Sequence, residues 1–253
     1  MIGTGEKGCA DIRFSAKSNG GHASRPPKNS PLIRLGKFMC EVERSHLFEK
    51  KLGTTAKEML RRMAKGMKQP LRTVLGHPDL FSPLIKAVLP SVSAFGAAML
   101  QTTLAFTVAH GSDSTNALPE EAYVVGNMRF SHHQGFEASL AAVKKIADKY
   151  DIEVTVLDPG ITTKEVDFRS EAFRTMEEAV RSTFENVTPS PYLAMSASDN
   201  RFMSLVSDNC FGFSPFNVSD QQLAAIHGID ENIDISCLPK AVAFYQNLMK
   251  NRK

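Results

Sequence analysis

The sequence predicts an α/β protein in which a ferredoxin-like unit, interrupted by a helical insertion, is followed by a second α/β unit. The first observation is the order strand, helix, strand, strand, helix, strand between residues 9 and 157, which is the split βαβ pattern. The second is a helix-rich block inside that order, at about residues 50–101. The third is a change of pattern after Asp158-Pro159-Gly160, beyond which helices and strands alternate as in an α/β layer.

Hydrophobic periodicity defines the elements of the ferredoxin-like unit. In residues 9–17 apolar and polar residues alternate, as in a half-buried strand. Residues 30–47 show apolar side chains at helical spacing behind Ser30, a plausible N-cap. The same reasoning predicts strands at 102–110, 121–130 and 152–157 and a helix at 135–150, with the second and third strands forming a hairpin-like pair.

The insertion and the second unit follow from propensity and from helix breakers. Residues 55–101 are rich in Leu, Met and Ala and predict a mainly helical block with breaks at the prolines Pro70, Pro78, Pro83 and Pro90. Beyond residue 160 the expected elements are a helix at 170–186, a strand at 192–195, a helix at 199–206, a strand at 210–216 and a closing helix from about Ser236. These elements are few for an α/β domain. Either the sheet of this domain is small, or most of its strands belong to sequence outside this chain.

Composition narrows the class of protein. The chain has 253 residues, 42% of them hydrophobic, enough for a sizeable core. Its formal charge of +3 comes from 30 basic and 27 acidic residues with no tract that would follow a phosphate backbone, so we expect no nucleic-acid partner. Four separated cysteines form no CxxC pair, which favours a reducing compartment. With no signal-like N-terminus and no apolar run long enough to span a bilayer, we expect a cytoplasmic chain without a membrane partner.

The first candidate for chemistry is His22, in a loop after the strand at 9–17. Gly20-Gly21 allows backbone angles that other residues avoid, and Pro26-Pro27 bars an immediate helix. The loop therefore presents a single imidazole at the end of a strand. For an arbitrary protein, an ordinary surface histidine would be the simpler interpretation.

Three other groups could bind substrate. Asn116 lies in the polar loop between the paired strands and Arg129 at the end of the second of them, although an Asn in a polar turn is ordinarily structural. Arg201 follows a predicted strand, where loops of α/β sheets line ligand crevices and a guanidinium can hold a carboxylate bidentately. Simple helix capping by Ser198 or Asp199 would explain the same loop.

A last group surrounds His227. Gly228 gives the imidazole backbone room, and Asp230 and Glu231 supply negative charge close enough to orient it or a neighbouring cation. One histidine does not make a metal site, because zinc takes about four ligands.

Five short motifs follow one another along the chain: Gly20-Gly21-His22-Ala23-Ser24-Arg25-Pro26-Pro27; Ser114-Thr115-Asn116-Ala117-Leu118-Pro119 with Asn127-Met128-Arg129-Phe130; Ser198-Asp199-Asn200-Arg201; Phe211-Gly212-Phe213-Ser214-Pro215; and Ile226-His227-Gly228-Ile229-Asp230-Glu231. In this order they resemble the second half of M20-family metallopeptidases, most of all the aminoacylase and carboxypeptidase S branch. In that family a ferredoxin-like lid, which also forms the dimer, is inserted into an α/β catalytic domain with two zinc ions. The resemblance implies a lid at 11–157, catalytic-domain sequence at 1–10 and 158–253, and a homodimer through the lid.

The resemblance also implies roles for single residues. His22 is similar to the lid histidine that reaches across the dimer to stabilise the oxyanion of the tetrahedral intermediate. Asn116 is similar to the lid amide that helps to bind substrate in the partner's site, and Arg129 to the arginine at the end of the neighbouring lid strand. Arg201 is similar to the arginine that grips the substrate carboxylate.

At the implied metal site, His227 is similar to the last zinc ligand, with Gly228 beside it at the substrate. The family's other ligands, including an HxD histidine and a bridging aspartate, and its general-base glutamate precede the lid. The motif His77-Pro78-Asp79 has the HxD spacing but falls in the insertion, and Glu120-Glu121 opens a lid strand. Glu6 resembles a glutamate that follows the last preceding ligand, and we do not count it as a ligand.

The expected activity is therefore zinc-dependent hydrolysis of the amide bond of an N-acyl amino acid or small peptide with a free carboxylate. With one ligand and no base, we expect this chain to be a C-terminal portion that is inactive alone. Two alternatives stay open: a non-catalytic dimerisation module or truncated product, and a protein that binds a carboxylate through Arg201 and Asn116. The exact substrate and the role of the insertion are not predicted.

Overall fold

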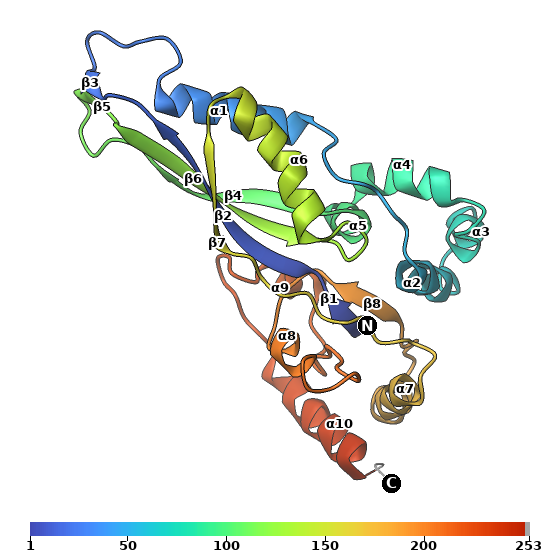
Figure 1. Ribbon diagram of the computed structural model, residues 1–253. Coiled ribbons are helices and arrows are strands. Elements are labelled where there is room, and N and C mark those ends of the chain that lie inside the picture. The colour runs from blue at the N-terminus through green and yellow to red at the C-terminus, as the bar shows by residue number, and fades with distance from the viewer. Residues whose placement is uncertain (251–253) are drawn as a thin grey trace.

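A four-stranded antiparallel sheet dominates the computed structural model, which describes residues 1–250 (Figure 1). Its strands are β2 (Gly8–Lys17), β4 (Thr103–His110), β6 (Glu121–Phe130) and β7 (Glu153–Asp158). They lie in the order β4-β6-β2-β7, and every neighbouring pair is antiparallel. This is the ferredoxin-like order, so the predicted fold class and the hairpin-like pairing of β4 with β6 are confirmed.

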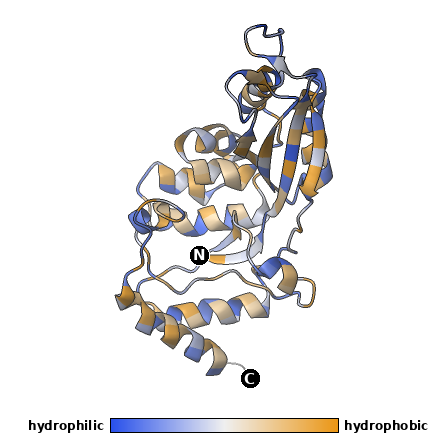
Figure 2. Cartoon of the chain, turned by 90° about the vertical axis from the view of Figure 1, so that its left-hand side faces the viewer, coloured by the Kyte–Doolittle hydropathy of each residue, from blue (hydrophilic) through white to orange (hydrophobic). Residues whose placement is uncertain are grey.

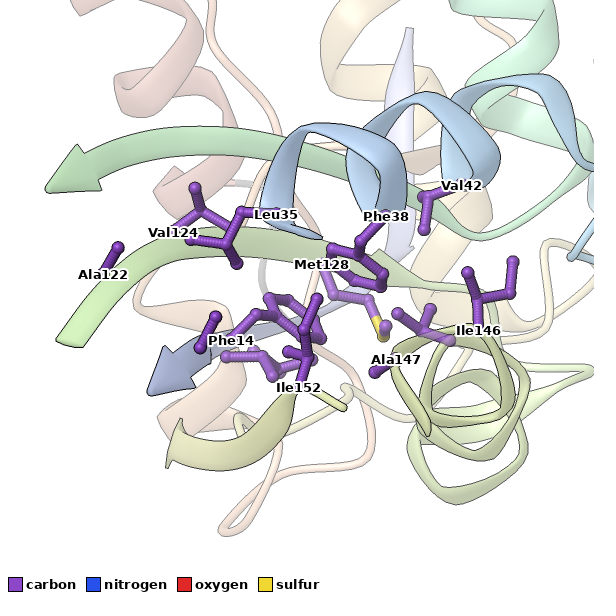
Figure 3. Packing of buried hydrophobic residues seen from close by; sticks show 14 of the residues in the cluster. Phe14, Leu35, Phe38, Val42, Ala122, Val124, Met128, Ile146, Ala147 and Ile152 are labelled. Carbon is purple, nitrogen blue, oxygen red and sulfur yellow. The ribbon is translucent and has the colours of Figure 1, made fainter. Parts of the chain in front are cut away.

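Two helices, α1 (Pro31–Arg44) and α6 (Gly135–Lys149), cover one face of this sheet. Hydrophobic and hydrophilic residues alternate along the strands (Figure 2), and the hydrophobic set points to the helices. Phe14 of β2 packs against Phe38 of α1 with ring centroids 4.9 Å apart (Figure 3). Both rings also contact Phe106 of β4. The period of two in the sequence thus identified the buried face.

The predicted insertion is helical and lies beside the sheet (Figure 1). It comprises α2 (Thr54–Ala64), α3 (Leu71–Gly76), α4 (Ser82–Val92) and α5 (Ala94–Leu100), with a core of its own formed by Leu52, Ala56, Met59, Leu60, Ile85 and Leu100. Pro70 and Pro83 lie at helix starts and Pro78 lies in the turn between α3 and α4, so the helical block is broken at these three prolines, as predicted. The break expected at Pro90 is wrong: this proline lies inside α4, only two residues before its end, where the missing N–H costs a single hydrogen bond.

The sheet of the second unit is small. It contains two parallel strands, β1 (Ile2–Glu6) and β8 (Pro191–Ala194), surrounded by α7 (Glu171–Thr183), α8 (Asn200–Met203), α9 (Asp220–Ala224), a 3-10 turn (Ile235–Cys237) and α10 (Leu238–Lys250). The helix predicted at 170–186 is confirmed as α7, with Ser170 as its N-cap accepting from the Phe173 N–H at 3.2 Å. The helix predicted at 199–206 is shorter, and β1 and α9 were not predicted.

The strand predicted at residues 210–216 is wrong. Only Gly212 pairs, in an isolated bridge with Gly3, through N···O distances of 2.7 and 2.9 Å. The alternating aromatic residues of this segment pack against helices instead of forming a sheet face: Phe211 lies 5.9 Å from Phe173 of α7, and Phe213 lies 4.7 Å from Phe244 of α10, measured between ring centroids.

Candidate functional site

His22 and Asn116 meet at the far end of the four-stranded sheet, in a region we call the sheet tip: β3 (Gly21–His22), β5 (Ala117–Leu118) and their loops (Figure 1). His22 pairs with Ala117 in this two-stranded ribbon, and the Ala23 N–H donates to the Asn116 carbonyl at 2.9 Å. The structure therefore places these two candidate residues side by side.

The contacts of His22 determine which of its ring nitrogens can donate a hydrogen bond to a ligand. The backbone N–H of Ser24 donates to Nδ1 at 3.1 Å, and the Ser24 hydroxyl lies 2.8 Å from the same atom. Because a backbone N–H only donates, Nδ1 is the acceptor, and the proton of the neutral ring belongs on Nε2. The exposed imidazole thus offers one free donor.

Asn116 is arranged in a similar way. Its Oδ1 accepts a hydrogen bond from the Ser114 hydroxyl at 2.5 Å, which leaves the amide NH2 without a partner in the part of the chain that the structure describes. Two glycines with positive φ, Gly20 at 65° and Gly21 at 132°, turn the chain into this ribbon. The tip therefore carries two donor groups that no other described residue uses.

Arg129 lies at the opposite end of the sheet, which we call the sheet base: the Glu6–Cys9 stretch, the end of β6 and the Asp158–Gly160 turn. It pairs with Cys9, and its Nε donates to Asn127 Oδ1 at 2.9 Å. Cys9 and Lys17, near the two ends of β2, are separated by roughly 26 Å at about 3.3 Å per residue. His22 and Arg129 of one chain therefore cannot contact the same small ligand.

The sheet base also holds a buried lysine that the sequence analysis missed. Lys7 is 1% exposed, and its Nζ donates to the carbonyl oxygens of Ala98 at 3.1 Å and Gln101 at 2.7 Å, at the end of α5. Burial, and after it the Arg129 guanidinium, lower the pKa of Lys7 from 10.5 to about 7. The adjacent charged residues Glu6 and Lys7, just before the strand predicted at 9–17, were the signal in the sequence.

Glu6, also buried, organises the loop that carries Arg201. Its carboxylate accepts from the Ser198 N–H at 2.8 Å and from the Ser198 hydroxyl, which in turn accepts from the Asn200 N–H at 3.2 Å. Ser198 thus links the carboxylate to the start of α8. The Arg201 guanidinium lies 4.7 Å from the centroid of the Phe202 ring and forms no ion pair within residues 1–250. A free guanidinium on an anchored loop can accept an anionic ligand.

His227 and Gly228 lie in the exposed loop after α9. His227 has a φ of 61°, and its backbone N–H donates to Glu231 Oε2 at 3.0 Å. The Glu231 carboxylate thus binds the backbone of His227, and the expectation that Asp230 and Glu231 orient the imidazole or a neighbouring cation stays a prediction. The Gly228 N–H donates to the Ala225 carbonyl at 2.8 Å. A cavity of about 530 Å³ adjoins this loop, lined mainly by apolar side chains that include Tyr192, Phe216, Leu223, Ile226 and Ile233.

Within residues 1–250, no three His, Cys, Asp or Glu side chains come close enough together to hold a metal ion. The rejected motif His77-Pro78-Asp79 is used otherwise: the Asp79 carboxylate pairs with Lys57 at 2.8 Å and with Arg61. The role of His227 as a metal ligand stays a prediction from the motifs.

This fold and these motifs define a class, the M20 peptidases. A family model described as the peptidase dimerisation domain matches residues 4–155, more than half of the chain, so the chain belongs to the M20 peptidase family. Among curated relatives, it is 25% identical over 254 residues to the probable carboxypeptidase S-like 2 of Dictyostelium discoideum, covering 99% of this chain and 48% of that protein. It is 24% identical to the N-fatty-acyl-amino acid synthase/hydrolase of Homo sapiens, covering 99% of this chain and 50% of that protein.

Solved structures support the same fold. The dipeptidase Dug1p of Saccharomyces cerevisiae superposes with a TM-score of 0.63 at 13% identity, covering 100% of this chain and 57% of that one. The M20 metallo-carboxypeptidase Sso-CP2 of Sulfolobus solfataricus gives a TM-score of 0.58 at 13% identity, covering 99% and 59%. The chain thus spans about half the length of the curated relatives that it matches.

Proposed function

We propose that this chain takes part in zinc-dependent hydrolysis of the amide bond of N-acyl amino acids or small peptides with a free carboxylate. The observation that carries the proposal is the pair of unused donors at the sheet tip, His22 Nε2 and the Asn116 amide. Donors held ready by their own neighbours are what a developing oxyanion requires. Membership of a peptidase family supports amide hydrolysis as the reaction that these donors would serve.

The proposal places the donors in the site of a second copy. In one chain the tip lies at the far end of the sheet from Arg129 and from the loops of α8 and α9 (Figure 1). A symmetric dimer through the lid would bring the tip of each chain to the Arg201 and His227 loops of the other. The match to a peptidase dimerisation domain supports this arrangement.

On the substrate side, Arg201 binds the free carboxylate, with Arg129 and Gly228 contributing to the same pocket. Arg201 suits this role because its guanidinium is free while its loop is anchored to Glu6. The mainly apolar cavity beside the His227 loop suits an acyl group. Relatives named as a carboxypeptidase and as an N-fatty-acyl-amino acid hydrolase support a substrate that combines a carboxylate with an amide-linked acyl or peptide group.

The metal is proposed to be zinc, two ions per site, which supply Lewis-acid activation of water when bound. His227 would be this chain's ligand. The described residues do not fit a complete site, so we derive no step through the metal. We propose that the other ligands and the general base belong to sequence outside these 253 residues, because the relatives are about twice as long. The chain alone would then be inactive.

Metal analysis and an amide-hydrolysis assay test this proposal together. The purified 253-residue chain is expected to hold fewer than two zinc ions and to leave N-acyl amino acids and dipeptides intact. The protein extended by any in-frame upstream sequence is expected to hydrolyse them, and to lose this activity with His227→Ala or with a chelator. Two tightly held zinc ions with chelator-sensitive hydrolysis by the chain alone would show that our ligand accounting is wrong.

A second candidate function is a non-catalytic dimerisation module, favoured by the absence of a three-ligand cluster within residues 1–250. It predicts a stable dimer and no hydrolysis in any extended form. A carboxylate-binding protein would instead bind N-acyl amino acids through Arg201 in a manner that chelators leave unchanged.

A further inference from the structure

Helix α4 of the insertion has an exposed face without a charged residue. Leu84, Val88 and Val92 are 47%, 47% and 71% exposed, and the helical repeat places them along one side. Leu80 before the helix and Phe95 after it, 75% and 44% exposed, extend the same apolar character. We call this set the apolar ridge; the other exposed residues of α4 are Pro83, Ala87 and Ser91.

The fold of the insertion does not need this ridge. A neighbouring side of α4 buries Ile85, which is 3% exposed, with Leu89 packed against the same core. The insertion contacts β8 through α2, and α4 lies on the side of α2 away from the small sheet (Figure 1). Soluble proteins rarely expose a continuous apolar surface unless something binds there.

The charge of the insertion indicates the kind of partner that binds the apolar ridge. Residues 50–101 contain nine Lys or Arg and two Asp or Glu, a formal net charge of +7. The rest of the chain contains 21 basic and 25 acidic residues, a net charge of −4. The positive charge of the whole protein is therefore concentrated on the insertion. A helical segment that is both basic and exposed in apolar side chains matches an anionic, apolar partner.

Several of these charges are available to a partner. Lys65, Lys68 and Arg72 are exposed and form no salt bridge within residues 1–250, and Leu71 between the last two is 56% exposed. A lipid surface that carries anionic headgroups offers both required features, since each nearby basic residue attracts it and apolar side chains enter the acyl boundary.

We propose that the helical insertion docks onto an anionic lipid surface, with the apolar ridge entering the headgroup region and the basic side chains contacting the headgroups. Such a helix lies on the membrane. No helix within residues 1–250 is long and apolar enough to cross one. The proposal revises the expectation of no membrane partner, which rested on the lack of a spanning segment, and it is independent of the proposed hydrolytic function.

Co-sedimentation of the 253-residue chain with vesicles tests the proposal. Binding is expected to vesicles of phosphatidylcholine mixed with phosphatidylglycerol, to fall with added salt, and to be weak to phosphatidylcholine alone. Leu84→Glu/Val88→Glu is expected to lower binding by at least about tenfold. The matched control Val242→Glu/Met249→Glu, which places the same charges on exposed apolar positions of α10, is expected to retain it.

A second pair of variants isolates the charges. Lys68→Gln/Arg72→Gln is expected to weaken binding by roughly 30-fold and to reduce its salt dependence, whereas Lys144→Gln/Lys145→Gln on the exposed side of α6 leaves both unchanged. Equal binding to neutral and anionic vesicles, or no loss with the ridge variant, would overturn the proposal. So would a ridge variant that dissociates a lipid-free oligomer, because a second copy would then cover the ridge.

Discussion

The tip and the base of the same sheet are built in opposite ways. At the base, Glu6 and Lys7 are buried, and each binds a segment distant in sequence: the Ser198 loop and the end of α5. At the tip, His22 and Asn116 are exposed, and the side-chain bonds that hold them come from residues two positions away. Polar groups at the base therefore hold the chain together, while those at the tip are left free to bind something else.

The largest loss of stability is expected from a side chain added at Gly160, in the sheet base. Gly160 has a φ of 66°, and a Cβ there would lie 1.7 Å from the carbonyl oxygen of Cys9. Gly160→Ala should lower the free energy of unfolding by at least about 3 kcal/mol, measured by urea denaturation. Gly135→Ala is the control, because Gly135 has a φ of 71° but open space around it, and should cost only about 1 kcal/mol. Equal losses would mean that packing at the base is loose.

Lys7 makes the stability of the base depend on pH. Its pKa falls to about 7 in the folded chain, so between that value and 10.5 the unfolded chain binds one more proton. Stability should therefore rise with pH in this window, by about 1.4 kcal/mol per unit from this group. A neutral amine keeps two N–H donors, enough for the carbonyls of Ala98 and Gln101.

Urea denaturation across this pH window tests the contribution of Lys7. Lys7→Met should remove the rise, whereas Lys144→Met, at an exposed lysine of α6, should leave it in place. Identical slopes for the wild type and Lys7→Met would contradict the lowered pKa.

Glu6 should show a smaller effect, confined to one loop. Glu6→Ala removes the acceptor of the Ser198 N–H and hydroxyl and should cost about 2 kcal/mol. Hydrogen exchange should accelerate at residues 196–201, because the loop of Arg201 loses its anchor. Glu6→Gln, which keeps one acceptor oxygen, should lose about half as much. Unchanged exchange in this loop would show that Arg201 is positioned by other contacts.

Hydrophobic periodicity predicted the strands of the four-stranded sheet, but not the segments that pack at the sheet base. Ile12 and Phe14 alternate with polar residues because one face of β2 is buried, and that face can be read locally. Phe211 and Phe213 alternate in the same way, yet they pack on helices, because periodicity shows which side is buried and not what covers it. The strand β1 escaped prediction because its two glycines hide the pattern and its partner lies almost 190 residues away.

The candidate site was predictable as a set of residues and not as an arrangement. The order of the motifs identified His22, Asn116 and Arg201. It could not show that the four-stranded sheet lies between Arg201 and the other two residues. Lys7 was missed because a lysine between strands is normally solvated. Only the fold of the insertion, far away in sequence, shows that carbonyl groups surround it.

The smallest effect on stability is expected at the tip. His22→Ala and Asn116→Ala should change the free energy of unfolding by no more than about 0.5 kcal/mol, since both side chains are exposed and contact only near neighbours. A loss above about 1 kcal/mol in urea denaturation would make the tip structural and remove the contrast with the base.

The same substitutions should matter most for catalysis, if the tip serves a second copy. In the extended protein, His22→Ala should lower kcat by roughly 10²- to 10³-fold. His227→Ala should abolish activity, yet mixing the two inactive variants should restore about one quarter of the wild-type rate, because half of randomly formed dimers contain one site with both histidines intact. Recovery requires that each His22 acts in its partner's site. If the mixture stays inactive although dimers exchange, His22 acts within its own chain or not at all, and the free donors of the tip need another explanation.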